Sequence, residues 1–330
     1  MSQPPVPQPP VVVIAGPTAS GKSAVAIELA LRFGGEIVNA DSVQVYKYLD
    51  IGTAKPSLAD RARVPHHLLD VVRPDEPYDA GRYAAEARAA AAQIHARGGV
   101  PFVVGGTGLY IRAFLEGLLA DAPADPELRA ELEREARRAA EQGDPHRLHR
   151  RLAALDPEAA RKIHPNDLRR IVRALELVER SGRTPSALRA AHRFADRPYR
   201  SLYLVLDPGV AELDARIDAR AQAMIDAGLL RECRWLREHG FGPELRPLQA
   251  IGYRHVMPVV DGLDTLANAL EGMRRDTRRF ARRQRTWFRG VRDAEWVHPD
   301  DRAAIEKRVA EFLAAAPAAA RASGARERSP

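Results

Sequence analysis

A glycine-rich turn near the start of the chain has the residue types and the spacing that bind phosphate. Gly16 to Ser23 read G-x-x-x-x-G-K-S, directly after four apolar residues, Val11 to Ile14, and directly before a helix expected over residues 24–32. In such a turn, backbone N–H groups and the amino end of the helix face an anion. Lys22 can neutralise phosphate oxygens, and the Ser23 hydroxyl can bind Mg²⁺. The turn predicts a diphosphate or polyphosphate site, and the alternative is a chance glycine-rich turn.

A carboxylate follows the second expected strand, residues 36–40. Asp41 therefore lies at the carboxyl end of a strand, and in an open parallel sheet this edge faces the ligand. Position alone equally allows a simpler interpretation, in which Asp41 only caps a turn of its own backbone. A second glycine-rich turn, Gly105 to Tyr110, follows the strand expected over residues 100–104 and indicates a close backbone approach at the same edge. The alternative for this turn is tight packing between a strand and a helix.

Arginines gather on the long helix expected over residues 263–289. Met273, Phe280 and Trp287 recur at intervals of seven and predict a buried stripe on this helix. A cationic stripe beside it consists of Arg278, Arg282, Arg285 and Arg289, with Arg274, Arg275, Arg279 and Arg283 nearby. So dense a row of like charges repels itself unless an anion lies close, which favours a nucleic-acid partner over an ordinary solvated face.

The order of the expected elements predicts an α/β fold. Buried strands alternate with helices at the start of the chain, and strand character returns at residue 201, which indicates a parallel sheet flanked by helices. Residues 120–200 show only helical spacing. We therefore expect an all-helical insertion domain between two parts of one core, 11–119 and 201–313. Residues 1–10 and 314–330 have the composition of disordered tails.

Bulk composition narrows the class of protein. The 330 residues are 45% hydrophobic and 29% charged, as in a globular protein, and the net charge of +7 allows an anionic partner. The single cysteine, Cys233, cannot form an intramolecular disulfide and fits a reducing compartment, so we expect a cytoplasmic protein. The adjacent pair His66-His67 is interpreted as loop packing rather than a metal site. No apolar run reaches about 18 residues, so no membrane span is expected.

Taken together, the motifs resemble those of one family, the tRNA dimethylallyltransferases, which modify an adenine of the anticodon loop. The resemblance runs from Val12 to about Gly290 and rests on six motifs in order. These are GPTASGKS (16–23), NADSVQVY through IGTAKP (39–56), GGTGLYIRA (105–113), IHPNDLRRIVRALE (163–176), QAIGYR (249–254) and RRQRTWFR (282–289). Ser23 stands where Thr is frequent and Arg282 where Lys is common, and the chain lacks the zinc finger of some eukaryotic relatives, so it is similar to the bacterial form.

The resemblance implies a P-loop NTPase-like core, a tRNA-binding helical insertion and a defined reaction. A dimethylallyl group would pass from dimethylallyl diphosphate to the exocyclic amine of the adenine 3′-adjacent to the anticodon, position 37, in tRNAs that read codons beginning with U. The products would be N6-dimethylallyladenosine and diphosphate. Mg²⁺ would be the cofactor, held by Ser23, and a monomer would act on the anticodon stem-loop.

The resemblance also implies roles for individual residues. Asp41 matches the general base, and Lys22 and Thr107 would act with it. The diphosphate would be bound by Gly16, Thr18, Ala19, Ser20, Gly21, Lys22 and Ser23, with Arg216 or Arg220 as a further cation. The tRNA would be contacted by Asp41, Ser42, Val43, Gln44, Thr107, Arg129, Arg169, Arg170, Ile171, Val172, Arg173, Gln249, Gly252, Tyr253, Arg254, Arg282, Arg283, Gln284, Thr286, Trp287 and Arg289.

Three other functions are compatible with parts of the sequence. A small-molecule kinase would use the turn from Gly16 to Ser23 for ATP and the insertion as a lid, but it does not explain the arginine row. An adenylate isopentenyltransferase would use the same donor with a free nucleotide as acceptor. An RNA-binding protein with a degenerate phosphate loop is disfavoured because Lys22, Ser23 and Asp41 are all present.

Overall fold

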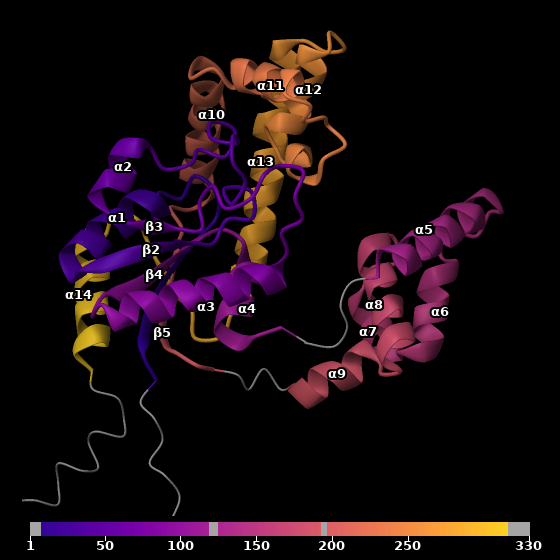
Figure 1. The fold of residues 1–330 in the computed structure, drawn as a ribbon, viewed down its shortest axis with the longest axis horizontal. Coiled ribbons are helices and arrows are strands. Elements are labelled where there is room, and N and C mark those ends of the chain that lie inside the picture. Colours follow the sequence, from indigo (N-terminus) through magenta and orange to yellow (C-terminus); the bar gives the residue numbers. More distant parts are fainter. Residues whose placement is uncertain (1–7, 119–124, 193–196, 316–330) are drawn as a thin grey trace, which may run out of the picture. The chain divides into compact units, whose positions relative to one another are not determined.

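One parallel sheet organises the larger part of the chain (Figure 1). The computed structural model describes residues 8–118, 125–192 and 197–315. Within these residues six strands pair in the order β3-β2-β4-β1-β5-β6, and every pair is parallel. The strands are β1 (Pro10–Ala15), β2 (Gly35–Asn39), β3 (His66–His67), β4 (Val100–Gly105), β5 (Arg200–Leu206) and β6 (Glu295–Val297). The predicted α/β fold with a parallel sheet is confirmed.

The first strand lies at the centre of this sheet. Val12 of β1 pairs with Phe102 of β4 on one side and with Leu202 of β5 on the other. Val11 to Ile14 are completely buried, because helices cover both faces of a parallel sheet. The turn that leaves β1 therefore emerges between two neighbouring strands, at the point where the strand order reverses and open parallel sheets bind ligands.

Helices cover both faces of the sheet. One face packs against α1 (Lys22–Phe33) and α14 (Arg302–Ala314), and the other against α3 (Ala80–Ala96) and α4 (Gly108–Glu116). Five further helical segments complete this part of the chain. They are α2 (Leu58–Arg63), α10 (Val210–Asp226), α11 (Leu229–Glu238), α12 (Tyr253–Val260) and α13 (Leu266–Arg289), with a 3₁₀ turn at Arg246–Gln249 before α12.

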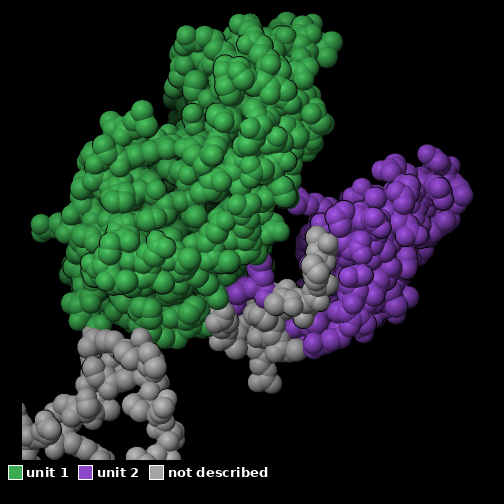
Figure 2. Space-filling view, in the orientation of Figure 1, with its two compact units in different colours: residues 1–115, 197–330 green, residues 116–196 purple. Residues whose placement is uncertain are grey.

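The chain divides into two compact units (Figure 2). Unit 1 comprises residues 1–115 and 197–330, and unit 2 comprises residues 116–196, whereas the sequence placed the boundaries near 120 and 200. Unit 2 has its own apolar core, in which Leu132, Leu152 and Leu175 are buried. Its described elements are all helical: α5 (Pro126–Glu141), α6 (Arg147–Leu155), α7 (Pro157–Lys162), α8 (Leu168–Ser181) and α9 (Pro185–His192).

Several local expectations differ from the structure. Strand β1 begins at Pro10, inside the expected tail, while residues 1–7 and 316–330 lie outside the described residues. The pair His66-His67 forms the edge strand β3 rather than a loop, and His67 bonds Glu36 on the neighbouring strand β2. The short strand β6 was not expected, because three residues are too few to show an apolar period, whereas α14 agrees with the helices expected at the end of the segment 201–313.

The predicted buried stripe of α13 is only partly correct. Met273 is buried, but Phe280 and Trp287 are 37% and 39% exposed. The neighbours of this helix change along its length: Gly272 lies against His255 of α12, whereas Gln284 bonds the turn that follows β1. The buried face rotates accordingly, so an interval of seven taken from the sequence does not follow it. Among the described residues, no helix has the length and apolar character needed to cross a bilayer.

Candidate active site

The turn from Gly16 to Ser23, here called the phosphate turn, has a backbone that only particular residues allow. A Cβ atom on Gly16 would lie 2.5 Å from the Leu206 carbonyl oxygen, and Ala19 and Gly21 both adopt left-handed conformations. Gly21 caps helix α1 without a side chain, so the N–H groups at its amino end stay open to an anion. Ser20 is fully buried, and its hydroxyl has no hydrogen-bond partner among the described residues.

A cavity at the carboxyl ends of β1, β2 and β4 brings the predicted chemistry together. Its walls include the phosphate turn, Asp41 and one arginine of α10, Arg220. All of its lining residues belong to unit 1. They are Thr18, Lys22, Ser23, Ile37, Asn39, Asp41, Gln44, Ala54, Pro56, His66, Leu69, Val104, Gly105, Arg220, Phe280 and Gln284. The cavity therefore joins an anion-binding turn to a carboxylate, as the sequence predicted for Lys22 and Asp41.

Lys22 is half-buried at the bottom of the phosphate turn, where its Nζ donates to the Pro17 carbonyl at 3.1 Å. Burial, with the positive charge of Arg220 nearby, lowers the pKa of Lys22 to about 8, and Asp41 opposes this shift. A negatively charged group bound beside Lys22 would therefore stabilise its ammonium form.

Asp41 combines both roles that its position allowed. Its Oδ1 accepts hydrogen bonds from the N–H groups of Val43 at 2.9 Å and Gln44 at 3.3 Å, which is the expected turn cap. Its backbone N–H donates to Asn39 Oδ1 at 3.2 Å. The carboxylate also lines the cavity, and its Oδ2 has no hydrogen bond within the described part of the chain. One oxygen fixes the orientation, and the other is available to a ligand.

The second glycine turn, Gly105 to Tyr110, is fastened to the segment that carries Asp41. Thr107 Oγ1 accepts from the Ser42 N–H at 3.0 Å and donates to the Ser42 hydroxyl at 3.3 Å, and the Thr107 N–H donates to the Ala40 carbonyl. Thr107, Ser42 and Val43 border this region without lining the cavity. Val43 packs against the core instead.

Gln284 of α13 links the two turns. Its Oε1 accepts from the Thr18 N–H and its Nε2 donates to the Gly106 carbonyl, both at 2.9 Å. The side chain is buried and both ends of its amide bond the protein, yet it lines the cavity, so its predicted contact with tRNA stays a prediction. Phe280, one turn earlier on the same face, also lines the cavity. Its spacing of four from Gln284 is the signal that could have identified it.

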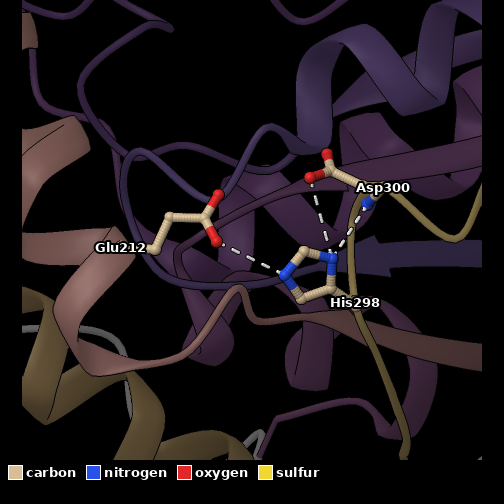
Figure 3. Close-up of side chains that lie close together, drawn as sticks. All are labelled: Glu212, His298 and Asp300. Atoms are coloured by element: carbon tan, nitrogen blue, oxygen red, sulfur yellow. Dashed lines mark hydrogen bonds and ion pairs between the residues drawn. The ribbon is translucent and has the colours of Figure 1, made fainter.

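The structure separates the two candidate cations of α10. Arg220 reaches the cavity and donates through Nη2 to the Thr53 carbonyl at 3.2 Å. Arg216 lies beside Gly21 but is paired with Glu212 and, at 3.6 Å, with Asp300. Figure 3 shows these two carboxylates around His298, an arrangement with the donor types of a metal site. Arg216 is already paired with both carboxylates, so the geometry favours Arg220 as the cation of the cavity.

The arginine row of α13 has anions of its own. Arg278 pairs with Asp218, Arg285 with Asp207 at 2.7 Å, and Arg282 more loosely with Asp214 at 3.6 Å. The argument that the row needs a bound nucleic acid is therefore weaker than the sequence indicated. Other residues of RRQRTWFR also have partners within the protein. The Arg283 guanidinium lies over the Phe280 ring, and the Arg112 guanidinium lies over the Trp287 ring. The Thr286 hydroxyl donates to the Arg282 carbonyl.

The motif QAIGYR is divided between the surface and the core. Gln249 and Arg254 are exposed, and Arg254 pairs with Asp276 at 2.6 Å. Gly252 starts α12 in a conformation with positive φ. Tyr253 is completely buried, and its hydroxyl donates to Glu232 of α11 at 2.7 Å. The ring of Tyr253 belongs to the core, so a contact of this residue with tRNA stays a prediction that its side chain does not support.

The predicted tRNA residues of unit 2 divide in the same way. Ile171 and Val172 are buried in the core of this unit, so their side chains do not support the predicted contact with tRNA, which stays a prediction. Arg129 and Arg173 both donate to the buried carboxylate of Glu176. Burial raises the pKa of Glu176, but the two arginines outweigh this effect and hold it below its ordinary value. Arg169 and Arg170 are exposed on α8, as a contact with RNA requires.

Comparisons with known proteins cover nearly the whole chain. A model of the family described as IPP transferase matches residues 44–291, and a model described as isopentenyl transferase matches residues 9–69. A tRNA dimethylallyltransferase of Desulfatibacillum aliphaticivorans is 49% identical over 303 residues, which are 92% of this chain and 98% of the relative. One of Anaeromyxobacter dehalogenans (strain 2CP-C) is 53% identical over 299 residues, 90% of this chain and 98% of the relative.

Solved structures lead to the same family. A full-length tRNA isopentenylpyrophosphate transferase from Bacillus halodurans is 35% identical, with a TM-score of 0.68 and coverage of 93% of this chain and 97% of that one. A eukaryotic dimethylallyltransferase, studied while acting on tRNA, is 31% identical with a TM-score of 0.72, covering 95% and 77% of the two chains. The phosphate turn and Asp41 line the same cavity, and together with this site the matches show that the chain belongs to the IPP transferase family.

Proposed function

We propose that this chain transfers a dimethylallyl group from dimethylallyl diphosphate to the exocyclic amine of adenine 37 in tRNA. The observation that carries the proposal is that Lys22, Ser23 and Asp41 line one cavity. Such a cavity has a place for a diphosphate and, beside it, a group that can accept a proton. The curated relatives named tRNA dimethylallyltransferase support the choice of donor and acceptor.

The cavity residues fit the two halves of this reaction. The amine nitrogen attacks the first carbon of the dimethylallyl group, a C–N bond forms, and the C–O bond to diphosphate breaks. The amine loses one proton, which Asp41 accepts, because an exocyclic amine is a poor nucleophile without a base. The leaving diphosphate gains charge, which Lys22, Arg220 and the N–H groups of the phosphate turn spread.

Mg²⁺ fits the donors that the cavity offers. The Ser23 hydroxyl and the Asp41 carboxylate are hard oxygen ligands, the kind that Mg²⁺ prefers, and both line the cavity. We therefore propose Ser23 as the residue that holds the ion, which leaves the Asp41 carboxylate as the base. When bound, Mg²⁺ would neutralise part of the diphosphate charge.

An anticodon stem-loop is the proposed macromolecular substrate. A base must leave its stack to enter a cavity of this kind, and exposed cations on the protein attract the phosphate backbone. Exposed arginines are present in both units, among them Arg170 on α8 and Arg282 on α13. We place the enzyme in the cytoplasm, where its tRNA substrates are.

Mass analysis of nucleosides tests the proposal. Bacterial tRNA lacking the modification is incubated with the protein, Mg²⁺ and dimethylallyl diphosphate, and N6-dimethylallyladenosine is expected in the digest. In one control, AMP replaces tRNA. In another, ATP replaces dimethylallyl diphosphate and small molecules replace tRNA as acceptors. Prenylated AMP without prenylated tRNA would indicate an adenylate isopentenyltransferase, and ADP formation would indicate a kinase.

A further inference from the structure

A carboxylate on α11 holds the loop that follows Asp41. Glu232 Oε2 accepts from the backbone N–H groups of Ile51 at 2.8 Å and Asp50 at 3.1 Å. Its Oε1 accepts from the Gly52 N–H at 3.1 Å and from the Tyr253 hydroxyl at 2.7 Å. Four donors on one carboxylate use nearly all of its lone pairs. The three N–H groups that it binds are consecutive, so the carboxylate fixes the course of this backbone.

The same loop continues directly into the cavity. The Thr53 carbonyl accepts from Gln44 Nε2 at 3.1 Å and from Arg220 Nη2 at 3.2 Å, and the Ala54 carbonyl accepts from Gln44 Nε2 at 3.3 Å. Gln44 and Arg220 both line the cavity. The next residue, Lys55, anchors the far end of the loop through its ammonium group. The carbonyls that orient Gln44 and Arg220 therefore lie between two fixed points.

Tyr253 supports the near end of the loop by packing as well as by its hydroxyl. A Cβ atom on Gly52 would lie 2.5 Å from the Tyr253 ring, so glycine is required at this close approach. The tyrosine is completely buried. Its motif, QAIGYR, thus contributes a contact to the loop beside the cavity as well as residues at the surface.

We propose that Glu232, supported by Tyr253, is a positioning residue that sets the side chains of Gln44 and Arg220 for the diphosphate donor. The carboxylate acts through the backbone of residues 50–54 and does not itself reach the cavity lining. This inference deepens the proposed function and rests on it for the identity of the donor. Binding of dimethylallyl diphosphate can nevertheless be measured without any transfer to tRNA, so the positioning role of Glu232 and the proposed function can be disproved separately.

The test uses Glu232→Gln in the full chain. The amide keeps the shape of the side chain but turns one acceptor oxygen into a donor that faces backbone N–H groups. We expect the Kd for dimethylallyl diphosphate, measured by calorimetry with Mg²⁺, to rise about tenfold. The matched control is Glu238→Gln, on the exposed end of the same helix, which should leave the Kd unchanged.

A double-mutant cycle separates positioning from general damage. If Glu232 acts through Arg220, then Glu232→Gln should weaken donor binding little further in a chain that already carries Arg220→Met. Unchanged donor affinity in Glu232→Gln, or additive losses in the double variant, would overturn the proposal. If Glu232→Gln does not fold, Tyr253→Phe takes its place in the test. This change removes the one hydroxyl that donates to Glu232 and should reduce the affinity for dimethylallyl diphosphate by a smaller factor. Donor binding by a wild-type chain that does not prenylate tRNA would count against the proposed function alone.

Discussion

At the scale of single residues, Asp41 combines a structural contact with the proposed chemistry. Its Oδ1 closes a turn with two backbone N–H groups, and among the described residues none donates to Oδ2. An asparagine can keep the first role, because its own Oδ1 accepts the same bonds. It cannot accept the proton from an amine.

We therefore expect Asp41→Asn to lower kcat by about 10²-fold or more, the usual contribution of a positioned base. Affinity for tRNA should stay nearly unchanged, as measured by filter binding. Asp79→Asn is a matched control, because Asp79 accepts from two backbone N–H groups at the start of α3 in a similar way. Normal turnover in Asp41→Asn would remove this residue from the proposed mechanism.

Lys22 leads to a prediction about pH. With a pKa of about 8 in the free protein, the amine is charged below that pH and loses its charge above it. The charged form is the one that attracts diphosphate, so donor affinity should be highest below pH 8. Above it, the Kd for dimethylallyl diphosphate should rise by up to about tenfold per pH unit.

Calorimetry across this pH range measures the effect. Lys22→Arg is the informative control, since a guanidinium keeps its charge and should remove the alkaline loss of affinity. An affinity of the wild type that stays constant well above pH 8 would show that Lys22 does not titrate there.

At the scale of elements, α13 acts as a brace between two turns that are distant in sequence. Gln284 and Thr18 are 266 residues apart, yet their hydrogen bond holds the phosphate turn to this helix. The other end of the same amide holds Gly106, and a Cβ atom on that residue would clash with it. The two turns follow neighbouring strands of the sheet, and Gln284 adds a side-chain link between them beyond the strand pairing.

Gln284→Met keeps the length of the side chain and removes both hydrogen bonds. The Thr18 N–H and the Gly106 carbonyl lose their partner, at a cost of about 1–3 kcal/mol for each group that stays buried. We expect a lower melting temperature together with a reduced kcat. Gln93→Met, on the exposed face of α3, is the control and should change neither quantity. A Gln284→Met variant that melts like the wild type would contradict this bracing role.

The elements also show what the sequence could and could not reveal. The strands that precede the phosphate turn and Asp41 were predictable, because apolar runs and glycine spacing are local signals. The partners of Gln284 and Tyr253 were not, since a polar side chain on a helix finds its partner only when distant segments pack. Both residues belong to motifs that the family resemblance assigned to tRNA, and only the tertiary structure shows that they face inward. Ile171 and Val172 carried an apolar pattern that already argued for the core.

At the scale of the whole molecule, nearly all of the net charge of +7 belongs to unit 1, yet both units expose arginines. The proposed function requires both units to contact the same tRNA. Arg170 in unit 2 and Arg282 in unit 1 have side chains that are 57% and 62% exposed, and each has only a loose ion pair. They are better candidates for phosphate contacts than Arg278 or Arg285, which are paired with aspartates.

We expect Arg170→Gln and Arg282→Gln each to reduce the slope of log K for tRNA against log salt by about 0.7–0.9. In the double variant the slope should fall by the sum of the two decreases, as measured by binding titrations at several salt concentrations. Arg32→Gln, at the end of α1 far from the phosphate turn, serves as the control and should leave the slope unchanged. A double variant that loses no more than one single variant would mean that the two units do not contact the RNA together.

The place of unit 2 in the chain has a consequence for synthesis. Strand β1 is completed by β5, which the ribosome makes only after the whole of unit 2. Until then one edge of the most apolar strand has no neighbour, a state in which nascent chains associate wrongly. Rapid, independent folding of unit 2 would remove its own apolar residues as wrong partners for β1 during this interval, and a chaperone that shields β1 on the ribosome would serve the same end.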